Sequence, residues 1–281
     1  MAPARAGRAG LAPAGAAERG KTIGLRVVVL GSGSSGNCTL VEGDRGRVLI
    51  DCGLSARAAG QRLERVGCDP RTIDALIVTH EHGDHVGGAR NFSRRFGVPI
   101  YTSSRTAAAA GLDEKDVSAL LPIEAGRGFE AGGMRHHPFT VPHDSVDNVG
   151  LIVECAGTRL GYVTDLGHLT PLVTERLREC DVLVAEANHD TEMLKNGPYP
   201  WSVKQRILSR HGHLSNDEMA ELVSTVASKR TRKIFLAHLS STNNRPDLAL
   251  SACRRGLAAA GRQGVAVEAA TQHEVSGVME A

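Results

Sequence analysis

Short apolar runs alternate with amphipathic stretches along most of this chain. Residues 25–30, 75–78 and 181–185 are runs rich in Val, Leu, Ile and Ala, each only a few residues long. Runs of this length and composition predict strands that are buried on both faces. Between them, apolar residues recur three or four positions apart, which predicts helices. The pattern therefore predicts an α/β chain in which strands and helices are interleaved.

The predicted elements can be placed by residue number. Strands are predicted at 25–30, 38–42, 47–51, 75–79, 99–101, 135–141, 148–154, 159–164, 181–185, 233–237 and 264–268, with short strands between 111 and 133. Helices are predicted from Ser55 to Gly67, over 86–96 and 200–210, after Ser215, and over 246–260. Ser215 is followed three residues later by Glu218, which is the pattern of a capping box. A Gly/Ser loop at 31–37 fits either a phosphate cradle or a wide hairpin turn, and the sequence leaves both open.

Ligand-type side chains stand at the ends of five predicted buried strands. These residues are Asp51, His80, Asp165, Glu186 and His238. Strand ends that meet at one edge of a sheet are where α/β enzymes build their sites. The densest segment is Thr79–His85. Within the six positions 80–85 it contains three histidines and two acidic residues. Because imidazole and carboxylate are ligands of zinc and its neighbours, we expect a metal site here rather than a solvated polar loop.

Composition narrows the class of protein without naming a substrate. The 281 residues are 41% hydrophobic and carry a net charge of +2, which permits a nucleic-acid substrate but does not demand one. Six scattered cysteines without a Cys-x-x-Cys pair favour a reducing cytoplasm. The apolar runs are shorter than the ~20 residues of a membrane helix. Residues 1–21, rich in Ala, Gly and Arg, are expected to be a disordered tail, and 22–281 one domain.

The spacing His80-x-His82-x-Asp84-His85 resembles the central signature of the metallo-β-lactamase fold superfamily of hydrolases. The resemblance extends from about residue 25 to 240, and it implies a four-layer αββα sandwich. Further family positions are matched by Asp51, His143, Asp165 and His238.

The resemblance also implies a ligand set for two divalent metal ions, Zn²⁺ in the first place and Mn²⁺ as the alternative. One ion is expected to be held by His80, His82 and His143, the other by Asp84, His85 and His238, with Asp165 as the bridge. Such ions would share a hydroxide that attacks the substrate. Asp51 is expected to orient groups of the histidine loop. Since His82 replaces the Glu of iron-binding, oxygen-reducing members, redox chemistry is disfavoured, and Asp165 replaces the Cys of some true β-lactamases.

Three runs are similar to the YycJ/WalJ branch of the superfamily: Gly31–Asn37, Glu186–Asp190 and Gly212–Asn216. That similarity implies a cytoplasmic metal-dependent hydrolase with DNA exonuclease activity. Glu186 and His213 also resemble the pair that tRNA 3′-end maturases of the superfamily place beside the scissile phosphate. Together with Asp84, they are the expected catalytic residues. A salt-bridging carboxylate and a helix-start histidine remain the alternatives for Glu186 and His213.

Two enzymatic hypotheses and one non-enzymatic hypothesis follow. The first is a phosphodiesterase acting on nucleic acid, with DNA favoured over RNA, and the second is a hydrolase of a small thioester, lactone or cyclic phosphodiester. The third is a metal-stabilised binding module, which the complete ligand set disfavours. Of the remaining histidines, His136 and His137 are expected on strand faces, His168 and His211 are left unassigned, and His189 stays open as a site-lining residue.

Overall fold

The computed structural model describes residues 24–281, so the tail expected at 1–21 lies outside the described residues. The strands are β1 (Arg26–Gly31), β2 (Cys38–Gly43), β3 (Gly46–Ile50), β4 (Ala75–Ile77), β5 (Ile100–Thr102), β6 (Leu120–Pro122), β7 (Phe129–Ala131), β8 (Met134–Thr140), β9 (Val149–Cys155), β10 (Thr158–Val163), β11 (Val182–Glu186), β12 (Lys233–Ala237), β13 (Ala266–Ala269) and β14 (Met279–Glu280). The helices are α1 (Ala56–Arg65), α2 (Gly83–Val86), α3 (Ala89–Phe96), α4 (Ser104–Ala109), α5 (Pro171–Leu177), α6 (Thr191–Asn196), α7 (Trp201–Ile207), α8 (Asn216–Val226) and α9 (Pro246–Ala259), with a 3₁₀ turn η1 (Pro70–Thr72).

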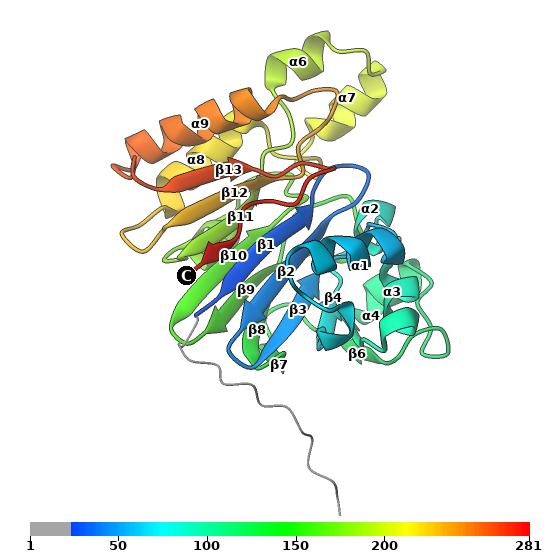
Figure 1. Cartoon of the computed structure of the whole chain (residues 1–281). Coiled ribbons are helices and arrows are strands. Elements are labelled where there is room, and N and C mark those ends of the chain that lie inside the picture. The colour runs from blue at the N-terminus through cyan, green and yellow to red at the C-terminus, as the bar shows by residue number, and fades with distance from the viewer. Residues whose placement is uncertain (1–23) are drawn as a thin grey trace, which may run out of the picture.

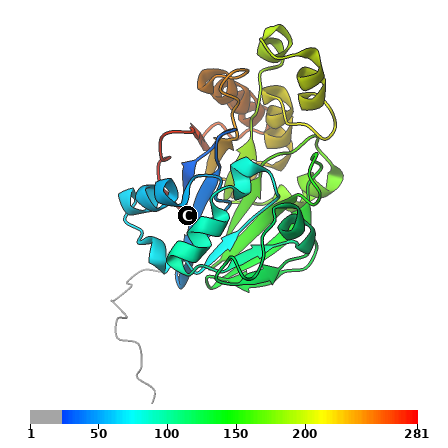
Figure 2. The same ribbon diagram turned by 90° about the vertical axis from the view of Figure 1, so that its right-hand side faces the viewer.

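Two mixed sheets form the centre of the fold. The first has the strand order β14-β1-β2-β3-β4-β5-β6, and the second has the order β13-β12-β11-β10-β9-β8-β7. One apolar cluster contains residues from both sheets, such as Val29 and Tyr162, so the sheets pack face to face. Helices α1, α3 and α4 cover the outer face of the first sheet, and α8 and α9 cover that of the second (Figures 1 and 2). The predicted αββα sandwich is confirmed.

Strand β1 shows why these strands appear as continuous apolar runs in the sequence. Val27 and Val29 belong to the cluster between the sheets, whereas Val28 and Leu30 belong to the cluster under α1 and α3. Successive side chains of a strand point to opposite faces. Because both faces of β1 are covered, every position is apolar instead of every second one.

The structure corrects several predicted helices. The helix predicted over 86–96 is present as α3, but it starts at Ala89 because α2 and α3 are separate. The N–H of Gly88 donates to Cys52 O at 2.8 Å rather than to α2, and Gly88 becomes the N-cap of α3. Helix α7 ends at Ile207, before the predicted residue 210. Helices α4, α5 and α6 and strand β14 were not predicted. The remaining strands differ from their predicted bounds mainly at the ends.

Parallel pairing brings the predicted site residues to one edge. Strand β3 runs parallel to β4, and β10, β11 and β12 run parallel to one another. Asp51 and His238 directly follow β3 and β12, and Asp165 is the second residue after β10; their φ angles are positive, at 60°, 56° and 55°. Residues with a Cβ seldom adopt this conformation, and it is found preferentially where function requires it. The chain therefore turns sharply at the point where each strand delivers an ionisable side chain.

Two further features bear on the setting of the protein. No helix within residues 24–281 has the length and hydropathy needed to cross a bilayer. The six cysteines are free thiols, and all but Cys155 are buried. The organisation of residues 22–281 as one domain stays a prediction.

Candidate metal centre

The histidine motif is held against the loop that follows β3. Backbone bonds join Cys52 N to His85 O at 2.8 Å and Asn37 N to Asp84 O at 2.7 Å. Gly53 allows this close approach, because a Cβ at that position would lie 1.7 Å from Asp84 O. The motif is thus fixed by contacts with segments that precede it by more than thirty residues.

All seven predicted metal ligands come together. His80, His82 and His143 form one group, and Asp84, His85 and His238 form another, with ligand atoms within 4.8 Å of one another inside each group. Asp165 lies between the groups, because Oδ1 is 3.6 Å from His143 Nε2 and Oδ2 is 3.0 Å from His85 Nε2. These two groups contain the same residues as the ligand sets that the resemblance implies, while two overlapping groups that could also hold an ion are Asp165, Glu186, His213 and His238, and His80, His85 and Asp165.

The distances between the ligand atoms suit divalent ions. His82 Nδ1 lies 3.2 Å from His143 Nε2, and Asp84 Oδ2 lies 3.1 Å from His238 Nε2 and 3.7 Å from His85 Nε2. Two ligands of a tetrahedral zinc ion stand about 3.3 Å apart at bond lengths of about 2.0 Å. His80 Nε2 is buried without a hydrogen-bond partner. Since buried polar atoms are rarely left unpaired, this nitrogen favours a cation beside it.

In four of the histidines, the ring nitrogen that faces away from the centre forms a hydrogen bond. The pairs are His80 Nδ1 with Thr79 Oγ1 at 3.0 Å, His85 Nδ1 with Asp51 Oδ2 at 2.8 Å, His143 Nδ1 with Gly212 O at 3.0 Å, and His238 Nδ1 with Glu186 Oε1 at 2.9 Å. Such bonds fix the orientation of a ligand ring and leave its Nε2 lone pair for the metal.

Asp51 is completely buried beneath the histidine loop. Its carboxylate accepts hydrogen bonds from the backbone N–H of Thr79 at 2.8 Å, the hydroxyl of Thr79 at 3.0 Å, the hydroxyl of Tyr162 at 3.3 Å and the imidazole of His85. This arrangement supports the predicted role of Asp51 in orienting the loop.

The electrostatics of the centre favour a bound cation. Burial lowers the pKa of His80 well below its usual value, so its imidazole is neutral. Burial would also lower the pKa of His85, but the carboxylates of Asp165 and Asp51 raise it to about 10. For Asp165, burial would raise the pKa, yet His238 and His85 hold it well below its usual range. Carboxylates placed this close to the imidazoles therefore favour positive charge at the centre, which a bound metal ion would supply.

Glu186 and His213 form a pair beside the metal ligands. Glu186, at the end of β11, is fully buried, and its Oε1 accepts from His213 Nδ1 at 2.8 Å as well as from His238. Its Oε2 accepts from the backbone N–H groups of Leu166 at 2.8 Å and Leu214 at 3.1 Å. Burial would raise the pKa of Glu186, but His213 and His238 lower it to about 2. In turn Glu186 and Asp165 raise the pKa of His213 against the effect of its burial.

Two neighbours of the centre were not singled out from the sequence. Asn37 Nδ2 lies 3.0 Å from His85 Nε2, and Asp144 Oδ1 lies 3.2 Å from His143 Nε2. Asp144 also pairs with Arg206 of α7. Two features of the sequence could have indicated them: Asp144 directly follows a predicted ligand, and Asn37 ends the Gly/Ser loop.

The Gly/Ser loop is a turn between antiparallel strands β1 and β2, as one of its two interpretations predicted. Most of its N–H groups are already used within the protein. That of Gly33 donates to Asn37 Oδ1 at 3.0 Å, and that of Ser35 donates to Gln272 Oε1 at 2.9 Å. The phosphate-cradle interpretation is therefore not supported.

The other histidines lie outside the two ligand groups. His136 is buried in β8 and donates from Nε2 to Ala131 O at 3.1 Å, while His137 lies 3.4 Å from Glu154. His168 contacts Arg210, and His211 is exposed. His189 is buried with both ring nitrogens unpartnered. It lies near Glu186 but belongs to neither metal group.

Comparison with known proteins agrees with this geometry. The family described as "Beta-lactamase superfamily domain" matches residues 46–238. Exodeoxyribonuclease WalJ of Streptococcus pneumoniae is 35% identical over 231 residues, covering 81% of this chain and 86% of that protein. Exodeoxyribonuclease YycJ of Bacillus anthracis is 33% identical, covering 81% and 87%. The metallo-β-lactamase fold protein YhfI from Bacillus subtilis has the same fold, with a TM-score of 0.70 and 16% identity over 92% of this chain and all of that one.

Proposed function

Because this chain belongs to the metallo-β-lactamase superfamily of metal-dependent hydrolases, we propose that it is a two-metal phosphodiesterase that degrades DNA as an exonuclease. The observation that carries the proposal is the Glu186–His213 pair beside the two ligand groups. Phosphodiester cleavage produces an alkoxide leaving group that needs a proton, whereas hydrolysis of a thioester or lactone has no need of an extra phosphate-facing acid. The names of the relatives support DNA as the substrate.

The proposed function assigns a role to each group of residues. His80, His82 and His143 would hold one ion, Asp84, His85 and His238 the other, and Asp165 would contact both. Divalent ions at these positions supply Lewis-acid stabilisation of phosphoryl charge and activation of water. Zn²⁺ suits the imidazole-rich donor set, and Mn²⁺ is the alternative. Asp84 would also help to orient the attacking nucleophile.

Glu186 and His213 would act on the leaving group. The bond from His213 Nδ1 to Glu186 fixes the imidazole ring, which leaves Nε2 for the substrate. Glu186 is itself held by two backbone N–H groups, so the pair cannot swing away without losing buried bonds. His213 would donate a proton from Nε2 to the departing oxygen and stabilise charge on the phosphate.

The direct test is metal content together with substrate class. Protein loaded with Zn²⁺ or Mn²⁺ should contain two ions per chain by elemental analysis, and should degrade DNA and cleave bis-p-nitrophenyl phosphate. RNA, a thioester and a lactone serve as competing substrates. Faster turnover of the thioester or lactone than of DNA would reject the phosphodiesterase in favour of the small-molecule hydrolase.

Replacing His213 with Ala separates catalysis from metal binding. The variant should keep two ions and lose about 100-fold in turnover on DNA, the lower end of what a positioned acid–base group contributes. The loss should be smaller on bis-p-nitrophenyl phosphate, whose leaving group needs no proton. His211→Ala, two residues away and exposed, is the matched control. Equal turnover of His213→Ala and the parent on both substrates would make His213 structural.

The free thiols also support a cytoplasmic location, which we propose for this chain.

A further inference from the structure

A basic segment carrying an exposed tryptophan projects beside the candidate metal centre. Between Glu186 of β11 and Leu214 before α8, the chain leaves the sheets and forms α6 and α7, which stand at the top of Figure 1. We call residues Lys195–Arg210 the arm. Its C-terminal end leads directly to His213, and Gly212 O accepts the bond from His143. The arm is therefore continuous with the site.

The arm exposes three large apolar side chains. Trp201 is 62% exposed, and Val203 and Leu208 are 36% and 42% exposed. Trp201 is the single tryptophan of a chain in which aromatic residues make up only 3%. Among residues 24–281, no other large hydrophobic side chain is as exposed as Trp201. Buried Lys204 donates to Lys195 O at 2.7 Å, so α7 is braced against α6 while Trp201 remains outside.

The arm is also more basic than the chain as a whole. The arm contains four Lys or Arg residues and no Asp or Glu, whereas the entire chain has 33 basic and 31 acidic residues. Arg206 reaches the rim of the centre, where it pairs with Asp144 next to His143. Arg210 contacts His168 and, among the ion pairs of residues 24–281, has no carboxylate partner. Lys195 pairs with Glu192, Arg206 pairs with Asp144 and Lys204 is buried, so within the described residues Arg210 is the exposed cation of the arm that has no carboxylate partner.

We propose that the arm binds single-stranded DNA, with one base stacked on Trp201 and a neighbouring phosphate near Arg210, so that the strand is led to the metal centre. This inference rests on the proposed exonuclease function. An exposed indole offers a face on which any unpaired base can stack, whereas a duplex keeps its bases stacked on one another. A basic group in the same arm matches a phosphate.

Trp201 itself provides the first test, because all tryptophan fluorescence of the chain comes from it. The metal-loaded full chain is titrated with a phosphorothioate oligothymidylate of about twelve nucleotides, a length within the range that single-strand grooves hold. The fluorescence should be quenched to saturation, and the apparent Kd should rise steeply with salt. A blunt duplex of equal length should quench much less. Unchanged fluorescence at saturating oligonucleotide, or equal quenching by the duplex, would overturn the proposal.

Variant kinetics provide the second test. Trp201→Ala should lower kcat/KM on single-stranded DNA about tenfold relative to kcat/KM on bis-p-nitrophenyl phosphate, mainly through KM. Trp201→Phe should restore most of the loss, since a phenyl ring also stacks. Val278→Ala removes an exposed apolar side chain before β14, on the other sheet, and should leave both substrates unaffected. Arg210→Gln should weaken DNA binding and flatten its salt dependence.

The outcomes separate this inference from the function on which it rests. If the parent degrades DNA and Trp201→Ala matches it, the arm proposal is wrong and the nuclease proposal stands. If the parent degrades no DNA while the oligonucleotide still quenches Trp201, binding by the arm stands and the nuclease proposal fails. If the parent is a dimer that Trp201→Ala dissociates, the exposed surface belongs to a second copy of the chain and the arm proposal is overturned.

Discussion

Strands β10, β11 and β12 carry ionisable residues at both ends, and the two ends differ in what neutralises the charge. At the carboxyl ends, Asp165, Glu186 and His238 contact other histidines and carboxylates of the metal centre. At the opposite end, Asp181 precedes β11 and accepts from Arg230 Nη2 at 2.8 Å and from the backbone N–H of Arg159 at 2.9 Å. Asp165 and Asp181 are both buried, with side chains 2% and 10% exposed.

The comparison shows that a fixed counter-charge and an exchangeable one have different consequences. The guanidinium group stays protonated at every ordinary pH, so Asp181 has a permanent partner. Imidazoles can give up a proton and offer a lone pair instead, so the neighbours of Asp165 can make room for a metal ion. The same residue type has a fixed partner at one end of the sheet and exchangeable partners at the other.

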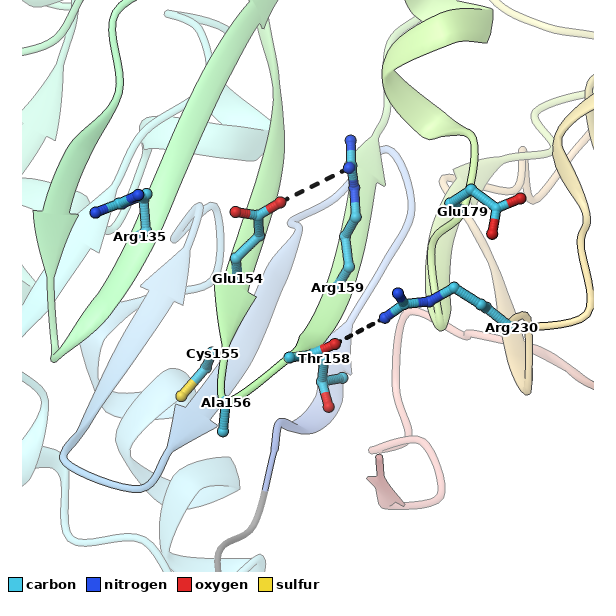
Figure 3. A pocket seen from close by; sticks show the side chains of 9 residues that line it. Arg135, Glu154, Cys155, Ala156, Thr158, Arg159, Glu179 and Arg230 are labelled. Atoms are coloured by element: carbon cyan, nitrogen blue, oxygen red, sulfur yellow. Dashed lines mark hydrogen bonds and ion pairs between the residues drawn. The ribbon is translucent and has the colours of Figure 1, made fainter.

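A hollow of about 400 Å³ at the structural end illustrates the point (Figure 3). Arg135, Arg159 and Arg230 line it. Arg159 Nη1 lies 3.7 Å from Glu154, Arg230 bonds to Asp181 and to Gly157 O, and Arg135 is 3.8 Å from Glu130. Because every arginine has a carboxylate partner, the hollow offers no free charge for an anionic ligand.

Replacing each aspartate with asparagine tests the comparison most strongly. Asp165→Asn should lose at least one metal ion and about 10³-fold or more in kcat/KM, since metal ions contribute several kcal/mol of transition-state stabilisation. Asp181→Asn should retain both ions and the parent's turnover, and lower the free energy of unfolding by about 1 kcal/mol. Elemental analysis, kinetics and urea unfolding measure the three quantities. A loss of metal in Asp181→Asn would show that the two ends are not independent.

A glycine near the metal centre should tolerate a side chain less well than a glycine at the opposite end of the sheets. Gly53→Ala places a Cβ where Asp84 O already lies, so we expect a loss of about 1–3 kcal/mol in unfolding free energy together with weaker metal binding. Gly264→Ala, in the loop before β13, has nothing within 4 Å of its new Cβ and should change stability by less than about 0.5 kcal/mol. Urea unfolding of the metal-free and metal-loaded proteins gives both values. Equal stability of the two variants would mean that the loop after β3 relaxes freely.

The smallest expected effect concerns His136, a buried imidazole away from the centre. It is a loss of unfolding free energy that occurs only at acidic pH. Burial lowers the pKa of His136 to about 4, whereas its unfolded value is about 6.5. Below pH 6.5 His136 is protonated in the unfolded chain but stays neutral in the folded chain. The free energy of unfolding therefore falls until the pH reaches about 4. Between pH 7 and 5.5 the loss should be about 1 kcal/mol. His136→Gln should reduce this pH dependence, and an unchanged slope would contradict the assignment.

Much of the centre could be predicted because its residues follow strong local signals. The histidine motif is contiguous, and Asp51, Asp165 and His238 each come after a run of buried apolar residues. The structure brings these residues together as the resemblance implied. Helices α4, α5 and α6 were missed because six or seven residues are too few to show a periodicity, although Ser103, Thr170 and Asp190 cap them.

Contacts between distant segments could not be predicted in the same way. Asn37 meets His85 across 48 positions, and Arg206 meets Asp144 across 62. Neither pair leaves a trace in local composition, because the contact depends on how two sheets and an arm are stacked. The exposure of Trp201 belongs to the same class, since a tryptophan at the start of a helix is more often packed than exposed.

The sequence by itself predicted most of the strands, and the resemblance carried by the histidine motif implied the sandwich and a set of candidate ligands, because hydrophobic period and motif spacing are properties of neighbouring residues. Only the tertiary structure decided which ring nitrogen each histidine turns toward the centre, that Asp51, Asp165 and His238 adopt positive φ, and that His80 Nε2 remains unpaired. These properties depend on strand register and on the partners behind each side chain. A ligand's orientation is imposed by what packs against it, and that packing exists only in the folded chain.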